Sequence, residues 1–213
     1  MIGLPTETEA DVKAIAELVN KTLKVAEAAL GKKSRQLKIA VSVSTFVPKP
    51  HTPFQWCGQN SLAEIKAKQR LLKSLLTDKR LELKWHEAEM SVVEAALAKG
   101  HQQTAKAVER AFVLGAKFDN WTDFFSYACW QQAFADVGLD LEKEATASYS
   151  LNQELPWDIV NYGASKQWLK DEYQRALQAQ PTYDCRFHKC HSCAVCNGTV
   201  KMDLLVKRVN KAV

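Results

Sequence analysis

The pattern that most constrains the fold is a β-strand lying between two helical segments in the first third of the chain. Leu37–Phe46 alternates apolar and small or polar side chains, which is the period-two pattern of a strand. A helical pattern precedes it: it starts at Thr8-x-x-Asp11, which is like a capping box, and runs to about Leu30. A second helical pattern, capped by Ser61, runs to about Leu76. A short strand at 81–86 follows. Helices between successive strands predict parallel pairing, so the sequence predicts an α/β fold.

The two faces of the 37–46 strand differ in side-chain size. Its large apolar face would meet the helices, and the other face carries the small side chains of Ala40, Ser42 and Ser44. In a barrel those small residues would face the lumen and leave room there for a ligand. An open sheet with one wetter face is the alternative.

A rigid loop follows this strand. Pro48, Pro50 and Pro53 fix an extended path between the strand and Trp56. Loops at the carboxyl ends of parallel strands commonly carry functional sites, which makes this loop a site candidate. Lys49 and His51 would approach a substrate anion there, or would be solvated loop residues.

Four cysteines near the C-terminus suggest a metal site. They lie within twelve residues, as C-x4-C-x2-C-x2-C: Cys185, Cys190, Cys193 and Cys196. The C-x2-C-x2-C run is like the ligand run of a bacterial-type ferredoxin cluster. Its two C-x2-C units share one cysteine, which excludes two independent zinc knuckles, although a single zinc ion, disulfides and free thiols stay open. His188 and His191 would be exposed loop residues or would replace a thiolate, Arg186 and Lys189 would favour thiolates, and Asn197-Gly198 forms a turn.

Composition limits the class of protein. Hydrophobic residues make up 46% and charged residues 25% of the chain, as in an ordinary globular protein. No apolar stretch is long enough for a membrane span, and the isolated Cys57 and Cys129 favour a reducing, cytoplasmic location. The net charge of +5 permits an RNA partner without requiring one.

The middle of the chain is predicted to be helical. The predicted apolar stripes are Met90, Val93 and Leu97, and then Ala105, Val108, Phe112 and Gly115. Thr122 is predicted to cap an aromatic-rich helix, whose rings would form core or, alternatively, line a channel or stack on bases. Ser165 is predicted to cap a last helix, and the basic tail from Thr199 would be solvated or bind a polyanion.

Several segments resemble radical SAM proteins. Residues 2–8 and 41–56 are similar to the late barrel strands of that family, and to a branch with a cobalamin-binding-like N-terminal domain in particular. Three further segments resemble the C-terminal region of the same branch: Leu155-Pro156-Trp157-Asp158, Gly163-x-Ser165-Lys166, and Asp184-Cys185-Arg186 with the trailing cysteines.

The resemblance implies a partial barrel and candidate sites. Glu7 would follow a strand-end turn, with a first-turn carboxylate favoured by the helix dipole as the alternative. Phe46, Val47 and Pro48 would lie where the adenine of S-adenosylmethionine is held, or would be core residues. The chain lacks the C-x3-C-x2-C motif that holds the catalytic cluster in such enzymes. We therefore expect a C-terminal part that starts inside the barrel and cleaves S-adenosylmethionine only with an N-terminal half.

Together these observations predict α/β architecture: the last βα units of a radical SAM-type partial barrel at 1–86, a helical extension at 87–180, and a Cys-rich metal-binding segment with a basic tail at 181–213. The predicted function is the C-terminal portion of a radical SAM enzyme of unknown substrate, with an auxiliary iron–sulfur or zinc site. The alternative is a non-catalytic, metal-stabilised module that binds RNA or protein. The expected partner is the N-terminal half, or another chain, at an exposed barrel edge.

Overall fold

A computed structural model describes residues 1–185, 187–188 and 190–196, and these combine helices with a small parallel sheet. The α/β class is therefore confirmed. The chain divides into two compact units, one made of Met1–Lys49 with Cys57–Tyr149, and one made of Pro50–Trp56 with the chain from Ser150 onward. No helix in the described ranges is long and apolar enough to cross a bilayer.

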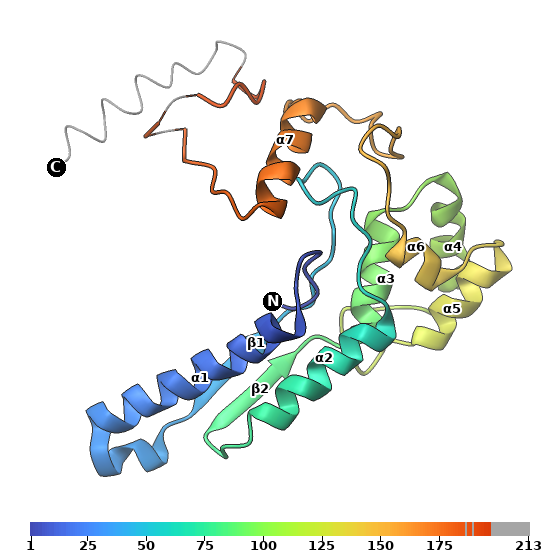
Figure 1. The fold of residues 1–213 in the computed structure, drawn as a ribbon. Coiled ribbons are helices and arrows are strands. Elements are labelled where there is room, and N and C mark those ends of the chain that lie inside the picture. The colour runs from blue at the N-terminus through green and yellow to red at the C-terminus, as the bar shows by residue number, and fades with distance from the viewer. Residues whose placement is uncertain (186, 189, 197–213) are drawn as a thin grey trace. The chain divides into compact units, whose positions relative to one another are not determined.

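The sheet of the first unit is parallel, as predicted. Strand β1 (Ile39–Val43) pairs with β2 (Leu81–Trp85), and Ile39 lies opposite Leu81 (Figure 1). Ile2 extends the pairing on the other side of β1 through a parallel bridge to Thr45. The Ile2 N–H donates to the Ser44 carbonyl at 2.9 Å, and the Phe46 N–H donates to the Ile2 carbonyl at 2.8 Å.

Both crossover helices begin at the predicted caps. Helix α1 (Glu9–Leu30) starts with a capping box between Thr8 and Asp11, and α2 (Leu62–Leu75) starts with one between Ser61 and Glu64. Gly31 ends α1 at a φ of 54°, a conformation that glycine adopts at little cost. A 3-10 helix, η1 (Gly31–Gln36), then leads into β1.

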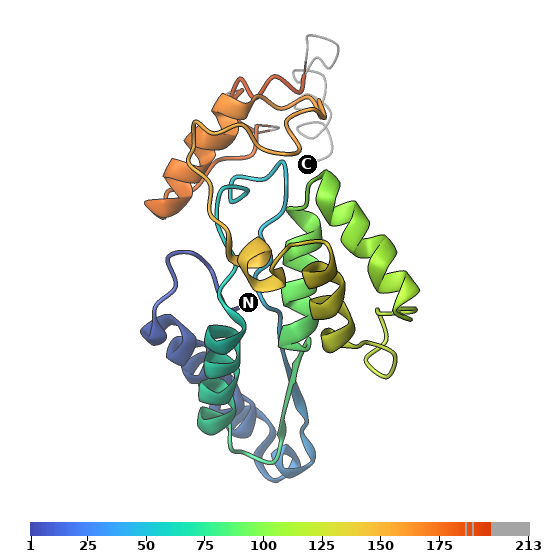
Figure 2. The same ribbon diagram turned by 90° about the vertical axis from the view of Figure 1, so that its right-hand side faces the viewer.

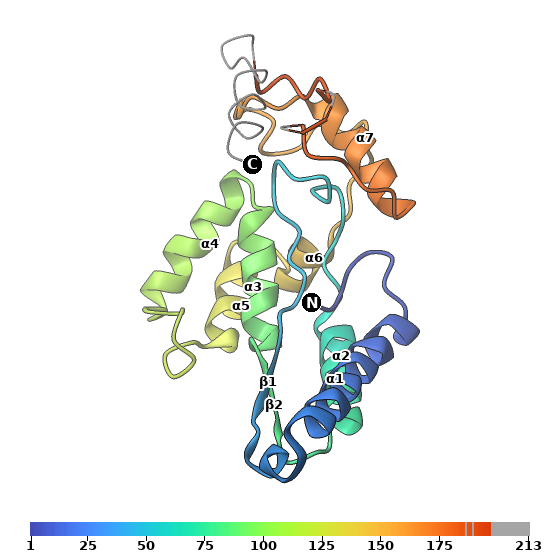
Figure 3. The same ribbon diagram turned by 90° about the vertical axis from the view of Figure 1, so that its left-hand side faces the viewer.

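Helices α1 and α2 cover the same face of the sheet (Figures 2 and 3). That face is closed by one apolar cluster: Ile2, Val12, Ala16, Val41, Val43, Leu72 and Leu76. The opposite face, with Ala40, Ser42 and Ser44, is exposed. The strands that the structure describes form no barrel, so the partial barrel stays a prediction.

Four helices form a second packed group in the first unit: α3 (Ala88–Ala98), α4 (Gln102–Val113), α5 (Tyr127–Asp136) and α6 (Leu141–Thr146). Alanines supply much of their shared core, and the large side chains of Trp130 and Phe134 fill its centre. Small side chains at helix contacts let the backbones approach closely, which explains how four short helices pack around one core.

The structure corrects two predictions in this group. The stripe of Ala105, Val108, Phe112 and Gly115 is not the buried face of α4, because Phe112 is 63% exposed. Thr104, Ala107 and Ala111 are buried instead, since the close contact with α5 selects small residues over large ones.

The predicted cap at Thr122 is also wrong. The cap of α5 is Ser126, whose Oγ accepts from the Cys129 N–H at 3.3 Å. The chain before it is held in turns, in which the Phe124 and Phe125 N–H groups donate to the Trp121 carbonyl. The helix therefore begins four residues later than predicted.

The second unit contains one helix in its described part, α7 (Lys166–Leu177), capped by Ser165 as predicted. Its buried apolar side chains are Trp56, Leu155, Trp157 and Leu169. The loop Pro50–Trp56 belongs to this unit although it follows β1 in the sequence.

Candidate functional site

The four clustered cysteines are free thiols in the structure. Cys190 is exposed, and Cys185, Cys193 and Cys196 are half-buried. Within the described residues, no three Cys, His, Asp or Glu side chains lie close enough together to hold a metal ion. The thiol groups and the short spacing of the four cysteines suit a metal, but the cysteines do not form a metal site in this structure. The metal centre therefore stays a prediction.

The backbone between these cysteines turns tightly. Ser192 and Ala194 have φ angles of 54° and 73°, and such left-handed residues reverse the chain over a short distance. The Ser192 N–H donates to the Cys190 Sγ at 3.4 Å. The Ser165 N–H donates to the Cys193 carbonyl at 2.8 Å and so ties the cysteine segment to the start of α7.

The histidines beside the cysteines have other contacts. The His191 Nε2 interacts with the Tyr183 carbonyl, and the His188 ring lies 4.9 Å from the Tyr183 ring. Both contacts agree with loop histidines that are not ligands. Arg186, Lys189, Asn197-Gly198 and the basic tail lie outside the described residues.

Glu7, a predicted cofactor-binding residue, is held by its own turn. Its carboxylate accepts the Gly3 N–H at 2.9 and 3.0 Å and pairs with Lys68 at 2.6 Å. The carboxylate side chain is only 5% exposed. This carboxylate therefore joins the first turn of the chain to α2, and a cofactor role for Glu7 stays a prediction.

The predicted adenine-binding residues are also well packed. Phe46 and Pro48 are buried, and Val47 packs against the core of the four-helix group. The Phe46 carbonyl accepts from the Gln59 Nε2 at 3.1 Å. Two neighbouring buried atoms, Thr45 Oγ1 and Gln59 Oε1, have no hydrogen-bond partner in the described chain. Sequence reasoning did not single out either residue, because an isolated Thr or Gln carries no signal of burial.

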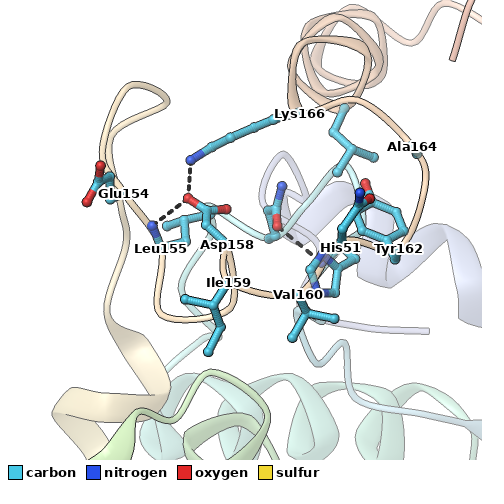
Figure 4. A pocket seen from close by; sticks show the side chains of 12 residues that line it. His51, Glu154, Leu155, Asp158, Ile159, Val160, Tyr162, Ala164 and Lys166 are labelled. Atoms are coloured by element: carbon cyan, nitrogen blue, oxygen red, sulfur yellow. Dashed lines mark hydrogen bonds and ion pairs between the residues drawn. The ribbon is translucent and has the colours of Figure 1, made fainter. Parts of the chain in front are cut away.

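A separate pocket lies wholly within the second unit (Figure 4). It has a volume of about 600 Å³, within the range of small-molecule sites. Three stretches of the sequence line it: His51 and Gln55; Glu154, Leu155 and Asp158 to Tyr162; and Ala164, Lys166 and Leu169. These stretches overlap the segments on which the family resemblance rests.

Gln55, a lining residue of the pocket, accepts two hydrogen bonds within the second unit. Its Oε1 accepts from the Trp157 Nε1 at 2.6 Å and from the His51 N–H at 3.1 Å. Both Gln55 and Trp157 are buried, so these bonds are shielded from water. His51 has a φ of 58°, which is strained for a side chain of its size, and its ring lies 4.2 Å from that of Tyr162.

An ion pair between Asp158 and Lys166 forms one wall. Asp158 Oδ2 also accepts the Leu155 N–H at 2.8 Å, and Lys166 Nζ donates to the Gln153 carbonyl at 3.0 Å. Partial burial by itself would raise the pKa of Asp158, but the Lys166 and Leu155 hydrogen bonds, with the nearby His51, hold it below its usual value. The carboxylate is thus ionised at neutral pH.

The sequence identified the parts of this pocket but not their assembly. His51 was a candidate contact for an anion, and Asp158 and Lys166 lay in segments that resemble a family. No sequence pattern pointed to Asn161 or Tyr162 as pocket residues. Lys49, the other candidate anion contact, belongs to the first unit and pairs there with Glu94 at 2.5 Å.

A buried lysine in the first unit was also not anticipated. Lys99 is 1% exposed, and its ammonium donates to the carbonyls of Cys57 at 2.8 Å and of Ala147. Burial lowers the pKa of Lys99 to about 8. The lysine therefore joins the residue that follows the proline-rich loop to the chain beyond α6.

Comparison with known proteins gives one partial match. The chain is 28% identical over 109 residues to an uncharacterised protein, MJ0966, of Methanocaldococcus jannaschii. The match covers 51% of this chain and 22% of that protein, so the chain matches only about a fifth of its relative's length. No family model and no solved structure matches the chain.

Proposed function

We propose that this chain is the C-terminal part of a radical SAM-type enzyme and that Cys185, Cys190, Cys193 and Cys196 bind an auxiliary iron–sulfur cluster. The observation that carries the proposal is the parallel β–α–β–α–β arrangement of Ile2, β1 and β2, with both helices on one face. A barrel has this geometry, because its helices all lie outside. The exposed face of Ala40, Ser42 and Ser44 is then the lumen side.

The exposed face of the sheet supports the proposal that further βα units belong to this barrel. Parallel sheets are normally covered on both faces, whereas the described residues cover one face of this sheet and leave the face of Ala40, Ser42 and Ser44 exposed. Its exposed face bears small side chains that would line a lumen. We propose that preceding βα units, on the same polypeptide or on another chain, pair at the sheet edge formed by Ile2 and so complete the barrel around that face. S-adenosylmethionine would bind only after completion, near Glu7, Phe46, Val47 and Pro48.

The cysteine segment supports a metal through its chemistry. Four thiols lie within twelve residues of the sequence, left-handed residues turn the backbone between Cys190 and Cys196, and a backbone N–H donates to the Cys190 Sγ. Metal sites of this kind often form only when the metal binds, so an open arrangement is compatible with a site. Zinc is the alternative ion. The missing C-x3-C-x2-C motif favours, as a second candidate function, a non-catalytic module that binds RNA or protein.

Metal analysis of the anaerobically purified full chain tests this proposal. We expect iron and sulfide in equal amounts, about four of each per chain for a cubane cluster. A C190S/C193S double variant should lose the metal, whereas a C57S/C129S control should retain it. One zinc per chain without sulfide would favour the second candidate. A preparation without metal, which also stays colourless after reconstitution with iron and sulfide, would refute the metal site.

A further inference from the structure

The pocket of the second unit has a charge pattern that selects its ligand. One wall carries Asp158 and Lys166 side by side, both about one third exposed. A ligand with only negative charge would be repelled by Asp158 and Glu154, and a ligand with only positive charge would be repelled by Lys166. The complementary partner of an ion pair is a second pair of opposite charges in the reverse order.

The ion pair has hydrogen-bonding capacity left for such a partner. Asp158 Oδ2 takes both the Lys166 and the Leu155 hydrogen bonds, which leaves Oδ1 as an acceptor. Figure 4 shows that oxygen pointing away from Lys166, toward the side of the pocket where His51 lies. Lys166 donates to Asp158 and to the Gln153 carbonyl, and an ammonium has three N–H groups, so one donor stays available. The ion pair therefore keeps one acceptor, on Asp158, and one donor, on Lys166, for a ligand.

The rest of the lining is suited to an apolar group. Leu155, Val160 and Leu169 line the pocket, and Ile159 lies at its edge with 92% of its surface exposed. A large aliphatic side chain so exposed gains most from an apolar group placed against it. The volume of about 600 Å³ leaves room for that group beside the charged wall.

From these features we infer that the pocket binds an α-amino acid group with an apolar side chain. The ligand ammonium lies on Asp158 Oδ1, the ligand carboxylate lies on Lys166, and the apolar side chain lies along Ile159 and Val160. The inference goes beyond the proposed function and does not depend on the cysteines or on a barrel. The Gln55–Trp157 bond and the strained His51 preorganise the site, which reduces the cost of binding.

Three matched compounds test the inference on the full chain by calorimetry or ligand-observed NMR. L-Leucine carries both charges, isoamylamine lacks the carboxylate, and 4-methylpentanoate lacks the ammonium. We expect L-leucine to bind with a millimolar or lower Kd, and each singly charged analogue to bind at least about tenfold more weakly. Equal binding of isoamylamine, stronger binding of an uncharged polyol such as D-ribose, or no L-leucine binding at about 10 mM would overturn the inference.

Two pairs of variants locate the site. D158N keeps a side-chain oxygen for the Leu155 N–H but removes the negative charge. It should weaken the binding of L-leucine by about tenfold or more and strengthen the binding of 4-methylpentanoate. K166Q should produce the opposite preference. D171N and K170Q, which lie on α7 outside the pocket lining, are the controls and should leave the affinities for L-leucine and for its analogues unchanged. If D158N does not fold, the three compounds on the unaltered protein decide the question alone.

Discussion

The two units of this protein are stabilised in different ways. The first unit buries two apolar clusters, one between the sheet and helices α1 and α2 and one among α3 to α6, and α1 and α2 begin with capping boxes. In the part of the second unit that the structure describes, two tryptophans and two leucines are buried, and Gln55 and Asp158 add polar bonds between its segments. Small units with little apolar core usually need a metal, a disulfide or a ligand to be stable. The difference therefore indicates a first unit that is stable alone and a second unit that depends on what it binds.

The largest effect is expected in the core shared by helices α3 to α6. Phe134 is fully buried among alanines, so Phe134→Ala should lower the free energy of unfolding by about 4 kcal/mol through lost transfer energy and a cavity. Urea denaturation followed by circular dichroism measures this. Phe124→Ala, at an exposed position of the same unit, is the matched control and should cost less than about 0.5 kcal/mol. Equal losses would mean that the alanine-rich core is not the stabilising element.

Lys99 gives the first unit a pH dependence. Its folded-state pKa of about 8 lies below the ordinary 10.5, so the unfolded chain binds more protons between these values and stability rises with pH. Between pH 8 and 10 the gain should be about 2 kcal/mol, and it should be absent in Lys99→Met. Above about pH 10 the gain should end, because burial raises the pKa of Tyr127 to about 12 and also raises the pKa of Tyr149, so both tyrosines ionise more readily in the unfolded chain. A gain of the same size in Lys99→Met would assign the effect to another group.

A smaller effect is expected at the hydrogen bond between Trp157 and Gln55 in the second unit. Trp157→Phe keeps most of the ring but removes the N–H that donates to Gln55 Oε1, at a cost of about 1.5 kcal/mol. Hydrogen exchange of the α7 amides should become faster, and the α2 and α3 amides should not change. Trp121→Phe, at an exposed ring of the first unit, should leave both sets unchanged. Faster exchange throughout the chain would show that the two units unfold together.

The smallest effect compares two helix caps. Ser165→Ala removes the acceptor for the Trp168 N–H at the start of α7, and Ser61→Ala removes the equivalent acceptor in α2, each costing about 1 kcal/mol. We expect the α7 amides to be affected by the first change alone and the α2 amides by the second. Since we expect the second unit to be the less stable one, Ser165→Ala should speed amide exchange in α7 more than Ser61→Ala speeds it in α2. The reverse order would contradict the ranking of the units.

Local signals made much of the first unit predictable, and longer-range contacts limited the rest. The strand alternation at β1 and the caps at Thr8, Ser61 and Ser165 depend on neighbouring residues, and the structure confirms them. The buried face of α4 was missed because alanines, not the large Val108 and Phe112, fit the contact with α5. The pocket was missed because it joins His51 to residues more than a hundred positions later, and periodicity carries no information on such pairs.

The most direct test of this account is hydrogen exchange of the anaerobically purified protein before and after removal of metal with a chelator. We expect the amides of α7 and of residues 155–165 to lose protection when the metal is removed, while those of β1, α2 and α3 keep theirs. A C57S/C129S variant should behave in the same way, which would exclude the isolated thiols as the source. Unchanged protection in α7, with metal shown to have been bound and removed, would contradict the proposal that a metal bound by the four cysteines stabilises the second unit.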